Sequence, residues 1–217
     1  MKIKGFLFDL DGVIVDTAVY HFQAWKRMAN ELGFDIYEEF NETLKGISRM
    51  DSIEAILKHG NVEISEEEKL RLATEKNEWY LEFVEQMTEA EILPGVKEFF
   101  AQFKALGIKC ALGSASKNAP KILEKINLLS EFDAIVDGNS VSKSKPNPEV
   151  FLKGAAVLGL QNEECVVFED ALAGVEAAQR ANMKTVGFGD KKVLSNADLV
   201  YNTFTEFTCE ELLKKLG

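Results

Sequence analysis

Residues 6–13 read Phe-Leu-Phe-Asp-Leu-Asp-Gly-Val, and this stretch decides the fold. Its three large apolar residues predict a buried strand. Asp9 and Asp11 are two positions apart, so both side chains project to the same face of an extended segment. Gly12 then lets the chain turn without steric cost. The stretch therefore predicts two acids at the exit of a core strand, which is where open α/β sheets bind ligands.

The two aspartates need a special reason, because aspartate is a poor residue for the end of a buried strand. A pair of carboxylates can bind Mg²⁺, and one of them can attack phosphorus while the other moves a proton. The alternative is an acidic turn between two elements. From this stretch alone, Asp9 and Asp11 can be either a catalytic, metal-binding pair or an acidic turn.

The composition allows a sizeable core and argues against polyanionic partners. The chain has 217 residues, of which 46% are hydrophobic, enough for one large domain or two modest ones. Its 25 basic and 36 acidic residues give a net charge of −11. We expect no nucleic acid and no membrane as partner, because binding either needs clustered Lys and Arg. A phosphate ester could bind only where local cations and a metal overcome this overall charge.

The first residues and the cysteines predict a cytoplasmic protein. Too few apolar residues separate Lys4 from Asp9 to form the core of a signal peptide. No apolar run approaches the roughly 20 residues that span a bilayer. Cys110, Cys165 and Cys209 are odd in number, far apart and without zinc spacing. Because Cys110 and Cys165 lie in apolar, strand-like stretches, we expect them to pack as reduced core residues in a reducing cytoplasm.

A block of helices follows the first strand. The apolar spacing from about residue 17 to residue 88 predicts helices only. We expect the longest of them to begin after Ser65 and to turn six residues inward: Leu70, Ala73, Tyr80, Phe83, Val84 and Met87. Placed directly after the acidic strand, this block of roughly 70 residues would cover the carboxyl end of the sheet as a lid that excludes water. A second packing domain without a gating role is the alternative.

Strands and helices alternate in the rest of the chain. Strands are predicted near residues 108–112, 134–136, 165–168, 184–187 and 199–201, with helices between most of them. Such alternation is typical of a parallel sheet with helices on both faces. We predict an α/β fold with a catalytic core at residues 1–16 and 92–217, into which a helical cap domain of residues 17–91 is inserted.

Two loops offer groups that can bind phosphate. Ser114 and Ser116 lie between a strand and a helix, where we expect the backbone N–H groups near Ser116 to form an anion site together with Lys117. An ordinary serine cap of the helix is the alternative. Farther along, Lys145 could neutralise the charge of a transferring phosphoryl group. Taken alone, Lys145 is better explained as a solvated lysine before a turn.

Glu169 and Asp170 end a second apolar strand at another strand-to-helix junction. Asp170 could equally cap the following helix. The carboxyl ends of parallel strands lie together, so these two acids should converge with Asp9 and Asp11. Four uncompensated carboxylates would repel one another strongly. Mg²⁺ resolves this repulsion, because it prefers a few carboxylates, waters and a phosphate oxygen.

These four motifs, in this order and spacing, resemble those of the haloacid dehalogenase-like superfamily of phosphotransferases over the whole chain. The resemblance implies a Rossmann-like core and an aspartyl-phosphate intermediate. It implies that Asp9 is the nucleophile and Asp11 the general acid and base. Ser114 would be the phosphate-binding hydroxyl and Lys145 the charge clamp. The Mg²⁺ ligands would be Asp9, the backbone carbonyl of Asp11, and Asp170, with Glu169 acting through a bound water.

The helical insertion resembles the cap of the β-phosphoglucomutase family. The matching segments are Thr17, residues 20–26 (Tyr-His-Phe-Gln-Ala-Trp-Lys), residues 44–52 (Leu-Lys-Gly-Ile-Ser-Arg-Met-Asp-Ser) and residues 114–118 (Ser-Ala-Ser-Lys-Asn). Members convert β-glucose 1-phosphate to glucose 6-phosphate through β-glucose 1,6-bisphosphate. The resemblance implies a Mg²⁺-dependent isomerase of carbohydrate metabolism that acts on a small sugar phosphate and uses that bisphosphate as primer. We also expect a monomer, although no sequence feature decides the oligomeric state.

The same resemblance assigns roles to the cap. Arg49 would hold the phosphate that is not being transferred, since a guanidinium grips phosphate in a bidentate manner. It implies that Ser116, Lys117 and Asn118 complete this distal phosphate site, and that Lys45, Gly46 and Ser52 position the sugar and the closed cap. Thr17 would be a catalytic residue, and Trp25 would form part of the wall of the site. His21 would contact Lys45 or Asp11. Without the resemblance, a lone helical histidine is usually structural, and a tryptophan on an apolar stripe usually belongs to the core.

Two other functions remain open beside the mutase. The first is a sugar-phosphate phosphatase with the same nucleophile, because both reactions pass through phosphorylated Asp9. The second is a binding module for a phosphorylated sugar, against which the presence of Asp9, Asp11, Lys145 and Asp170 together argues. Ala171 departs from the serine of many relatives, which could weaken the support of the metal but removes no ligand.

Overall fold

A computed structural model describes residues 2–217 and confirms the predicted α/β fold. Within these residues, six parallel strands form one sheet in the order β3-β2-β1-β4-β5-β6. Their bounds are Gly5–Phe8 (β1), Lys109–Gly113 (β2), Ala134–Val136 (β3), Cys165–Glu169 (β4), Lys184–Phe188 (β5) and Leu199–Tyr201 (β6). Phe8 of β1 pairs with Leu112 on one side and with Phe168 on the other. The carboxyl ends of β1, β2 and β4 therefore lie side by side.

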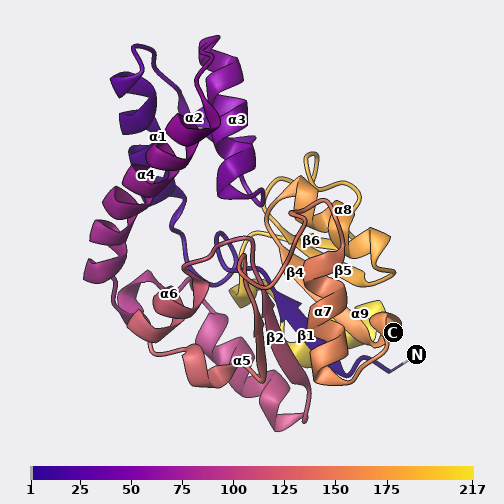
Figure 1. Cartoon of the computed structure of the whole chain (residues 1–217). Helices are drawn as coiled ribbons and strands as arrows, with labels where there is room; N and C mark the ends of the chain where they lie inside the picture. Colours follow the sequence, from indigo (N-terminus) through magenta and orange to yellow (C-terminus); the bar gives the residue numbers. More distant parts are fainter. Residues whose placement is uncertain (1) are drawn as a thin grey trace.

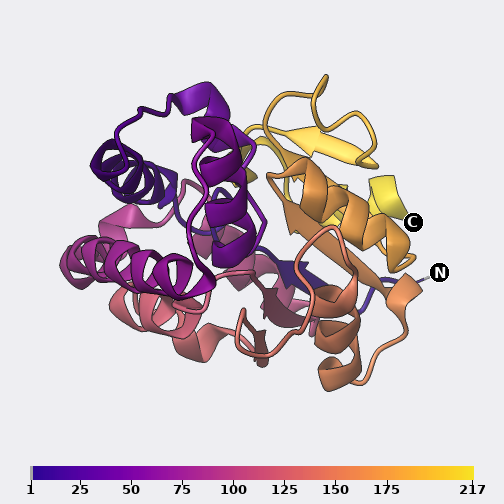
Figure 2. The same cartoon turned by 45° about the horizontal axis from the view of Figure 1, so that its top comes forward.

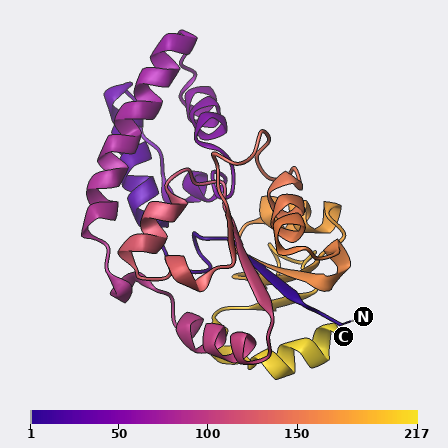
Figure 3. The same ribbon diagram turned by 60° about the horizontal axis from the view of Figure 1, so that its bottom comes forward.

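Helices cover both faces of the sheet, as Figure 1 shows. Their bounds are Val96–Ala105 (α5), Ala119–Lys125 (α6), Glu149–Leu158 (α7), Leu172–Arg180 (α8) and Cys209–Leu216 (α9). Phe6 and Phe8 pack with α5, α6 and α9, whereas Leu7 between them packs with α7 and α8. Figure 3 shows α5 and α9 next to each other on one face. The alternation of side chains along β1 thus builds the two layers.

Phenylalanine rings fill the layer beneath α5 and α9. The Phe8 and Phe168 rings stack with their centroids 4.7 Å apart, and Phe6 meets Phe103 edge to face at 5.3 Å. Phe99 of α5 is fully enclosed and lies 5.0 Å from Phe204. Aromatic pairs of this kind add to the free energy gained by burying their apolar surface. This cluster fixes the central strand, and through it the position of Asp9.

We expect Phe99→Ala to lower the free energy of unfolding by about 3–5 kcal/mol, because the cavity it leaves cannot fully collapse. Urea unfolding followed by circular dichroism measures this change. Leu106→Ala is the matched control, since Leu106 follows the same helix and is 48% exposed. We expect it to change the free energy by less than about 0.5 kcal/mol. Equal effects of the two variants would show that the aromatic cluster does not carry the stability.

Four helices form a separate group beside the carboxyl end of the sheet, as Figure 2 shows. They are Ala18–Glu31 (α1), Glu38–Glu42 (α2), Arg49–Gly60 (α3) and Glu66–Gln86 (α4). Ser48 and Ser65 begin α3 and α4 by accepting hydrogen bonds from backbone N–H groups three residues later. The helices share their own apolar cluster, which includes Trp25, Met28 and Leu57. Short 3-10 turns lie elsewhere, at Glu89–Glu91, Leu129–Glu131, Asn162–Glu164 and Phe204–Glu206.

The inward face of α4 is partly mispredicted from the sequence. Leu70 was expected inside, but it is 59% exposed, and Phe83 is only half-buried. Leu72 and Lys76 are buried instead. The helix turns Leu72 toward the cluster of α1 and α3, while its later turns face the core, so one apolar stripe does not describe both halves. A buried lysine also breaks the pattern on which hydrophobic periodicity depends.

Candidate active site

Lys145 joins the ends of β1 and β4. Its Nζ lies 2.5 Å from Asp9 Oδ1 and 2.5 Å from Glu169 Oε1, and all three side chains are buried. Burial alone would lower the pKa of Lys145, but the two carboxylates raise it above its usual value. The lysine therefore stays charged at neutral pH. Its charge compensates two acids that could not otherwise remain together in the interior.

Asp11 is the acid that holds a proton near neutral pH. Burial and the neighbouring charge of Asp9 raise the pKa of Asp11 to about 7, although the Thr17 hydroxyl donates a hydrogen bond to its carboxylate. The Tyr80 hydroxyl in turn donates to Thr17 Oγ1 at 3.3 Å. A carboxyl group with a pKa near the working pH can both give and take a proton. Asp9 and Asp11 thus have different environments that suit different tasks.

Glu169 and Asp170 are held by different partners. Besides Lys145, Glu169 accepts a hydrogen bond from the backbone N–H of Ala171 at 2.9 Å, so both of its oxygens are engaged. Asp170 lies 3.4 Å from the ammonium group of Lys45. Burial and the charges of Glu169 and Asp9 raise the pKa of Asp170 well above its usual value. Asp170 does not cap α8, since the cap position belongs to Ala171.

The residues present fit a magnesium ion with few protein ligands. Gly12 has a φ of +76°, and a Cβ on it would lie 2.2 Å from Asp170 Oδ2, so the backbone after Asp11 touches this carboxylate. Across residues 2–217, no three His, Cys, Asp or Glu side chains are grouped so as to bind a metal by themselves. Asp9 and Asp170 lie close enough for their charges to interact. Carboxylates are donors of the kind that Mg²⁺ combines with waters and phosphate oxygens.

The loop after β2 differs in one respect from the prediction. Ser114 is buried, and its hydroxyl accepts a hydrogen bond from the backbone N–H of Ser116 at 3.1 Å. The Ser116 hydroxyl accepts one from the N–H of Asn118 at 3.2 Å. Two N–H groups that we expected to face an anion are therefore occupied by local side chains, a competition that serine favours. The hydroxyl protons of both serines remain for a ligand.

Arg49 lies at the start of α3 and meets a residue that the sequence did not single out. Its Nη2 donates to Asn77 Oδ1 at 2.6 Å, and the same oxygen accepts from Asn118 Nδ2 at 2.8 Å. Asn77 of α4 thus joins the helical insertion to the loop after β2. Its only sequence signal is its position four residues after Ala73, on the inward stripe of α4.

His21 does not make the contact predicted for it. Its Nδ1 lies 2.8 Å from Lys76 Nζ, and its ring stacks on Tyr80, rather than meeting Lys45 or Asp11. Lys76 is 2% exposed and lies 4.1 Å from the centre of the Trp25 ring. Burial lowers the pKa of both His21 and Lys76. The charge of Lys76 lowers the pKa of His21 further, and the charge of Arg49 lowers that of Lys76. The prediction missed Lys76 because a buried lysine leaves no distinct sequence pattern.

A cavity of about 900 Å³ lies between α1–α4 and the sheet. Its wall contains most of the predicted site residues: Asp9, Asp11, His21, Trp25, Lys45, Gly46, Arg49, Ser52, Ser114, Ser116, Lys117, Asn118 and Asp170. Thr17, Lys145 and Glu169 are buried and do not line the cavity, but Thr17 is hydrogen-bonded to Asp11, and Lys145 contacts both Asp9 and Glu169. Ala171 packs near Gly46, where a Cβ would lie 3.3 Å from its methyl group.

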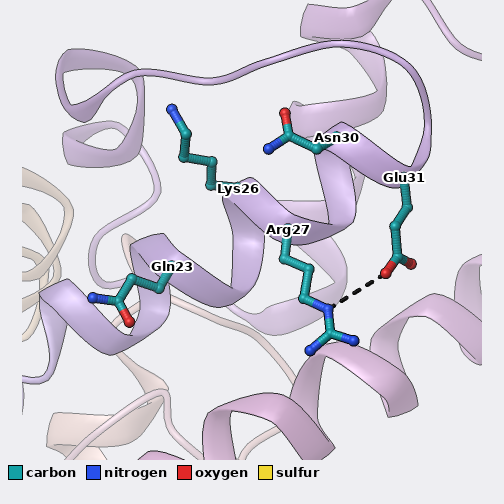
Figure 4. Close-up of a pocket in the computed structure, with 5 residues that line it drawn as sticks. All are labelled: Gln23, Lys26, Arg27, Asn30 and Glu31. Atoms are coloured by element: carbon teal, nitrogen blue, oxygen red, sulfur yellow. Dashed lines mark hydrogen bonds and ion pairs between the residues drawn. The ribbon is translucent and has the colours of Figure 1, made fainter.

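A second hollow of about 470 Å³ lies on α1 and has a different character. Its wall consists of Gln23, Lys26, Arg27, Asn30 and Glu31, as Figure 4 shows. Arg27 Nε lies 3.4 Å from Glu31 Oε1 across one turn of the helix, and both side chains are exposed. Exposed ion pairs of this kind contribute little to the stability of the folded protein. None of these five residues lines the large cavity, so the chemistry belongs to the cavity that holds Asp9.

The chain is similar to known proteins over nearly its full length. Residues 6–188 match the family of haloacid dehalogenase-like hydrolases. A β-phosphoglucomutase of Bacillus subtilis is 42% identical over 212 residues, covering 97% of this chain and 94% of that protein. The crystal structure of β-phosphoglucomutase from Clostridium difficile superposes with a TM-score of 0.96 at 43% identity, covering 99% of this chain and 97% of that one. A phosphorylated carbohydrates phosphatase of Thermotoga maritima is 30% identical, covering 91% and 93%.

Proposed function

The chain belongs to the haloacid dehalogenase-like hydrolase family, and from this premise we propose that it is a β-phosphoglucomutase. It interconverts β-glucose 1-phosphate and glucose 6-phosphate through phosphorylated Asp9 and β-glucose 1,6-bisphosphate. The observation that carries the proposal is a second polar cluster in the wall of the cavity that holds Asp9. In this cluster Arg49 and Asn118 share the Asn77 oxygen, and neither is hydrogen-bonded to Asp9, Asp11 or Asp170. A bisphosphate intermediate needs such a second phosphate site, whereas hydrolysis of a single ester does not.

Asp9 and Asp11 divide the chemistry. A carboxylate oxygen of Asp9 attacks phosphorus, and the bond from phosphorus to the sugar oxygen breaks as Asp11 protonates that oxygen. In the return step Asp11 removes the proton from the other sugar hydroxyl, which attacks phosphorus and frees Asp9. Lys145 offsets the charge of Asp9 while the anionic phosphoryl group approaches. Bound Mg²⁺, held by Asp9, the Asp11 carbonyl and Asp170, would lower the repulsion between the two anions.

The other predicted residues support the same cavity. Ser114 would bind the transferring phosphoryl group, and Ser116, Lys117, Asn118 and Arg49 the distal phosphate. Lys45, Gly46, Ser52 and Trp25 line the sugar-binding region. Thr17 acts from behind the cavity wall through Asp11, and His21 acts from the wall itself, where it contacts Lys76. We further propose residues 17–91 as a cap domain on a core of residues 1–16 and 92–217. The separate apolar cluster of α1–α4 supports this division.

We also propose a small sugar phosphate as the substrate, a cytoplasmic site of action and a monomeric state. Buried, unpaired Cys110, Cys165 and Cys209 favour a reducing compartment. Within residues 2–217 no helix has both the length and the apolar character that crossing a bilayer requires.

A primer experiment distinguishes the mutase from the phosphatase. Purified protein with Mg²⁺ and β-glucose 1-phosphate is assayed for glucose 6-phosphate by a coupled dehydrogenase, with and without a trace of β-glucose 1,6-bisphosphate. If the protein is a mutase, the bisphosphate should raise the rate of glucose 6-phosphate formation, because each cycle begins from phosphorylated Asp9. The activity of a phosphatase does not depend on the bisphosphate. If no glucose 6-phosphate forms even when the bisphosphate is present, the proposal is rejected.

Magnesium should stabilise the protein more at high pH than at low pH. Protons compete with the metal for the Asp170 carboxylate, because burial and the charges of Glu169 and Asp9 raise its pKa in the protein without metal. Because a metal that binds only the folded protein stabilises it, we expect MgCl₂ at about 5 mM to raise Tm by more at pH 8 than at pH 5.5. Comparing Tm with and without metal at each pH cancels the titration of other groups. An Asp170→Asn variant should lose this shift, and a shift independent of pH would contradict the assignment of ligands.

A further inference from the structure

Asp51 and Ser144 line the large cavity and connect the cap to the core, in a contact that has no role in the chemistry described above. The Ser144 hydroxyl donates a hydrogen bond to Asp51 Oδ2, between residues 93 positions apart in the sequence. The same oxygen accepts from Ser48 Oγ at 2.6 Å. One carboxylate oxygen on α3 thus binds the start of its own helix and a loop of the core at once.

The loop that carries Ser144 is fixed to the core on both sides. Before it, the backbone N–H groups of Ser142 and Lys143 donate to Glu149 Oε2 at 3.0 and 2.9 Å. After it, Lys145 binds Asp9 and Glu169. The Ser144 carbonyl accepts from the N–H of Asn147 at 2.9 Å, which closes the turn. Ser144 therefore presents its hydroxyl from a firmly placed backbone.

The other partner lies next to the residue proposed to hold the distal phosphate. Asp51 is two residues after Arg49, in the first turn of α3. The N–H of Asp51 donates to the capping Ser48 Oγ at 3.2 Å, which ties its position to the start of the helix. A movement of α3 away from the core would therefore carry Arg49 and Asp51 together, and would break the bond to Ser144.

We infer that the Asp51–Ser144 hydrogen bond is a latch that holds the cap closed over phosphorylated Asp9 while the sugar bisphosphate is in the cavity. The inference rests on the proposed mutase function. An open cap admits water, which attacks phosphorus. The bond from phosphorus to the Asp9 oxygen then breaks, Asp11 takes a proton from the water, and inorganic phosphate leaves. Asp51 and Ser144 are thus positioning residues that favour transfer to the sugar over transfer to water.

Ser144→Ala tests the latch with the least disturbance, because it leaves the serine that caps α3 in place. We expect the ratio of inorganic phosphate released to glucose 6-phosphate formed to rise about three- to tenfold, the effect of losing one partly exposed hydrogen bond to a charged group. The KM for β-glucose 1-phosphate should rise and Tm should stay the same. Ser144→Thr, which keeps the hydroxyl, should restore the ratio.

Two further variants separate the latch from general loosening. Ser140→Ala is the matched control, since its hydroxyl lies on the same loop but binds Asp137 of the core at 2.8 Å. We expect it to keep the wild-type ratio. Asp51→Ala should raise the ratio, and adding Ser144→Ala to it should raise the ratio no further, because both changes remove the same bond between the cap and the core.

The outcomes distinguish the latch from the function on which it rests. An unchanged ratio in Ser144→Ala, a rise equalled by Ser140→Ala, or additive effects of the two latch variants would each overturn the latch. If the wild-type protein already releases inorganic phosphate as its main product, the proposed mutase function fails, whatever the variants do.

Discussion

Replacing Asp9 with asparagine is expected to abolish both isomerisation and any release of phosphate, with a loss of at least about 10⁴-fold in kcat. The amide has nearly the shape of the carboxylate, but it is neutral and too weak a nucleophile to attack phosphorus. Lys145 would keep Glu169 as its charged partner, so the site should remain folded. The coupled assay measures the rate, and intact-mass measurement after acid quenching shows whether a phosphoryl group still becomes attached.

Asp16→Asn is the matched control for Asp9→Asn. Asp16 lies on the same segment, but its side chain is exposed and accepts a hydrogen bond from the N–H of Ala18. We expect kcat within about twofold of wild type. Retention of substantial turnover by Asp9→Asn, once its mass confirms the asparagine, would show that Asp9 is not the nucleophile.

Replacing Arg49 with alanine should separate isomerisation from simple hydrolysis. The guanidinium lies 2.6 Å from Asn77 and is proposed to grip the distal phosphate in a bidentate manner. We expect kcat/KM for β-glucose 1-phosphate to fall about 10²- to 10³-fold, as for the loss of roughly 3–4 kcal/mol of charge-assisted binding. Hydrolysis of acetyl phosphate, which has no second polar group to place there, should change by less than about threefold.

Arg27→Ala controls for the removal of an arginine from the cap. Arg27 lies on α1, where its guanidinium stacks on Trp79 at 4.0 Å and pairs with exposed Glu31. This variant should affect both reactions by no more than about twofold. An equal loss of isomerisation and acetyl phosphate hydrolysis in Arg49→Ala would place Arg49 in the shared chemistry and count against a distal phosphate site.

The arrangement of the sheet follows from the sequence because the core obeys simple patterns. The strand at Phe6 and Phe8 has large residues on both faces, and βα alternation after Leu93 favours one topology. Leu70 shows where such reasoning fails. Apolar periodicity gives the inward stripe of a helix that packs on one neighbour, whereas α4 passes from the cap cluster to the main core and changes its inward face.

The candidate site was predictable where chemistry-bearing residues stand at strand ends. Asp9, Ser114, Lys145 and Glu169 follow or end parallel strands or the loops next to them, so topology alone brings them together. Asn77, Lys76 and the Asp51–Ser144 pair come from helix faces and long-range contacts. Their positions depend on how the cap packs on the core, which no local pattern encodes. The contact of His21 with Lys76 was missed for the same reason.

The most direct test of the account is the fate of the phosphoryl group. Wild-type protein is incubated with Mg²⁺, β-glucose 1-phosphate and a trace of β-glucose 1,6-bisphosphate, and phosphorus NMR follows all phosphorus-containing products together. The account predicts that the β-glucose 1-phosphate signal is replaced by glucose 6-phosphate with little inorganic phosphate, and that the α anomer is not consumed. Inorganic phosphate as the main product would contradict it and would show that Asp9 transfers phosphoryl groups to water.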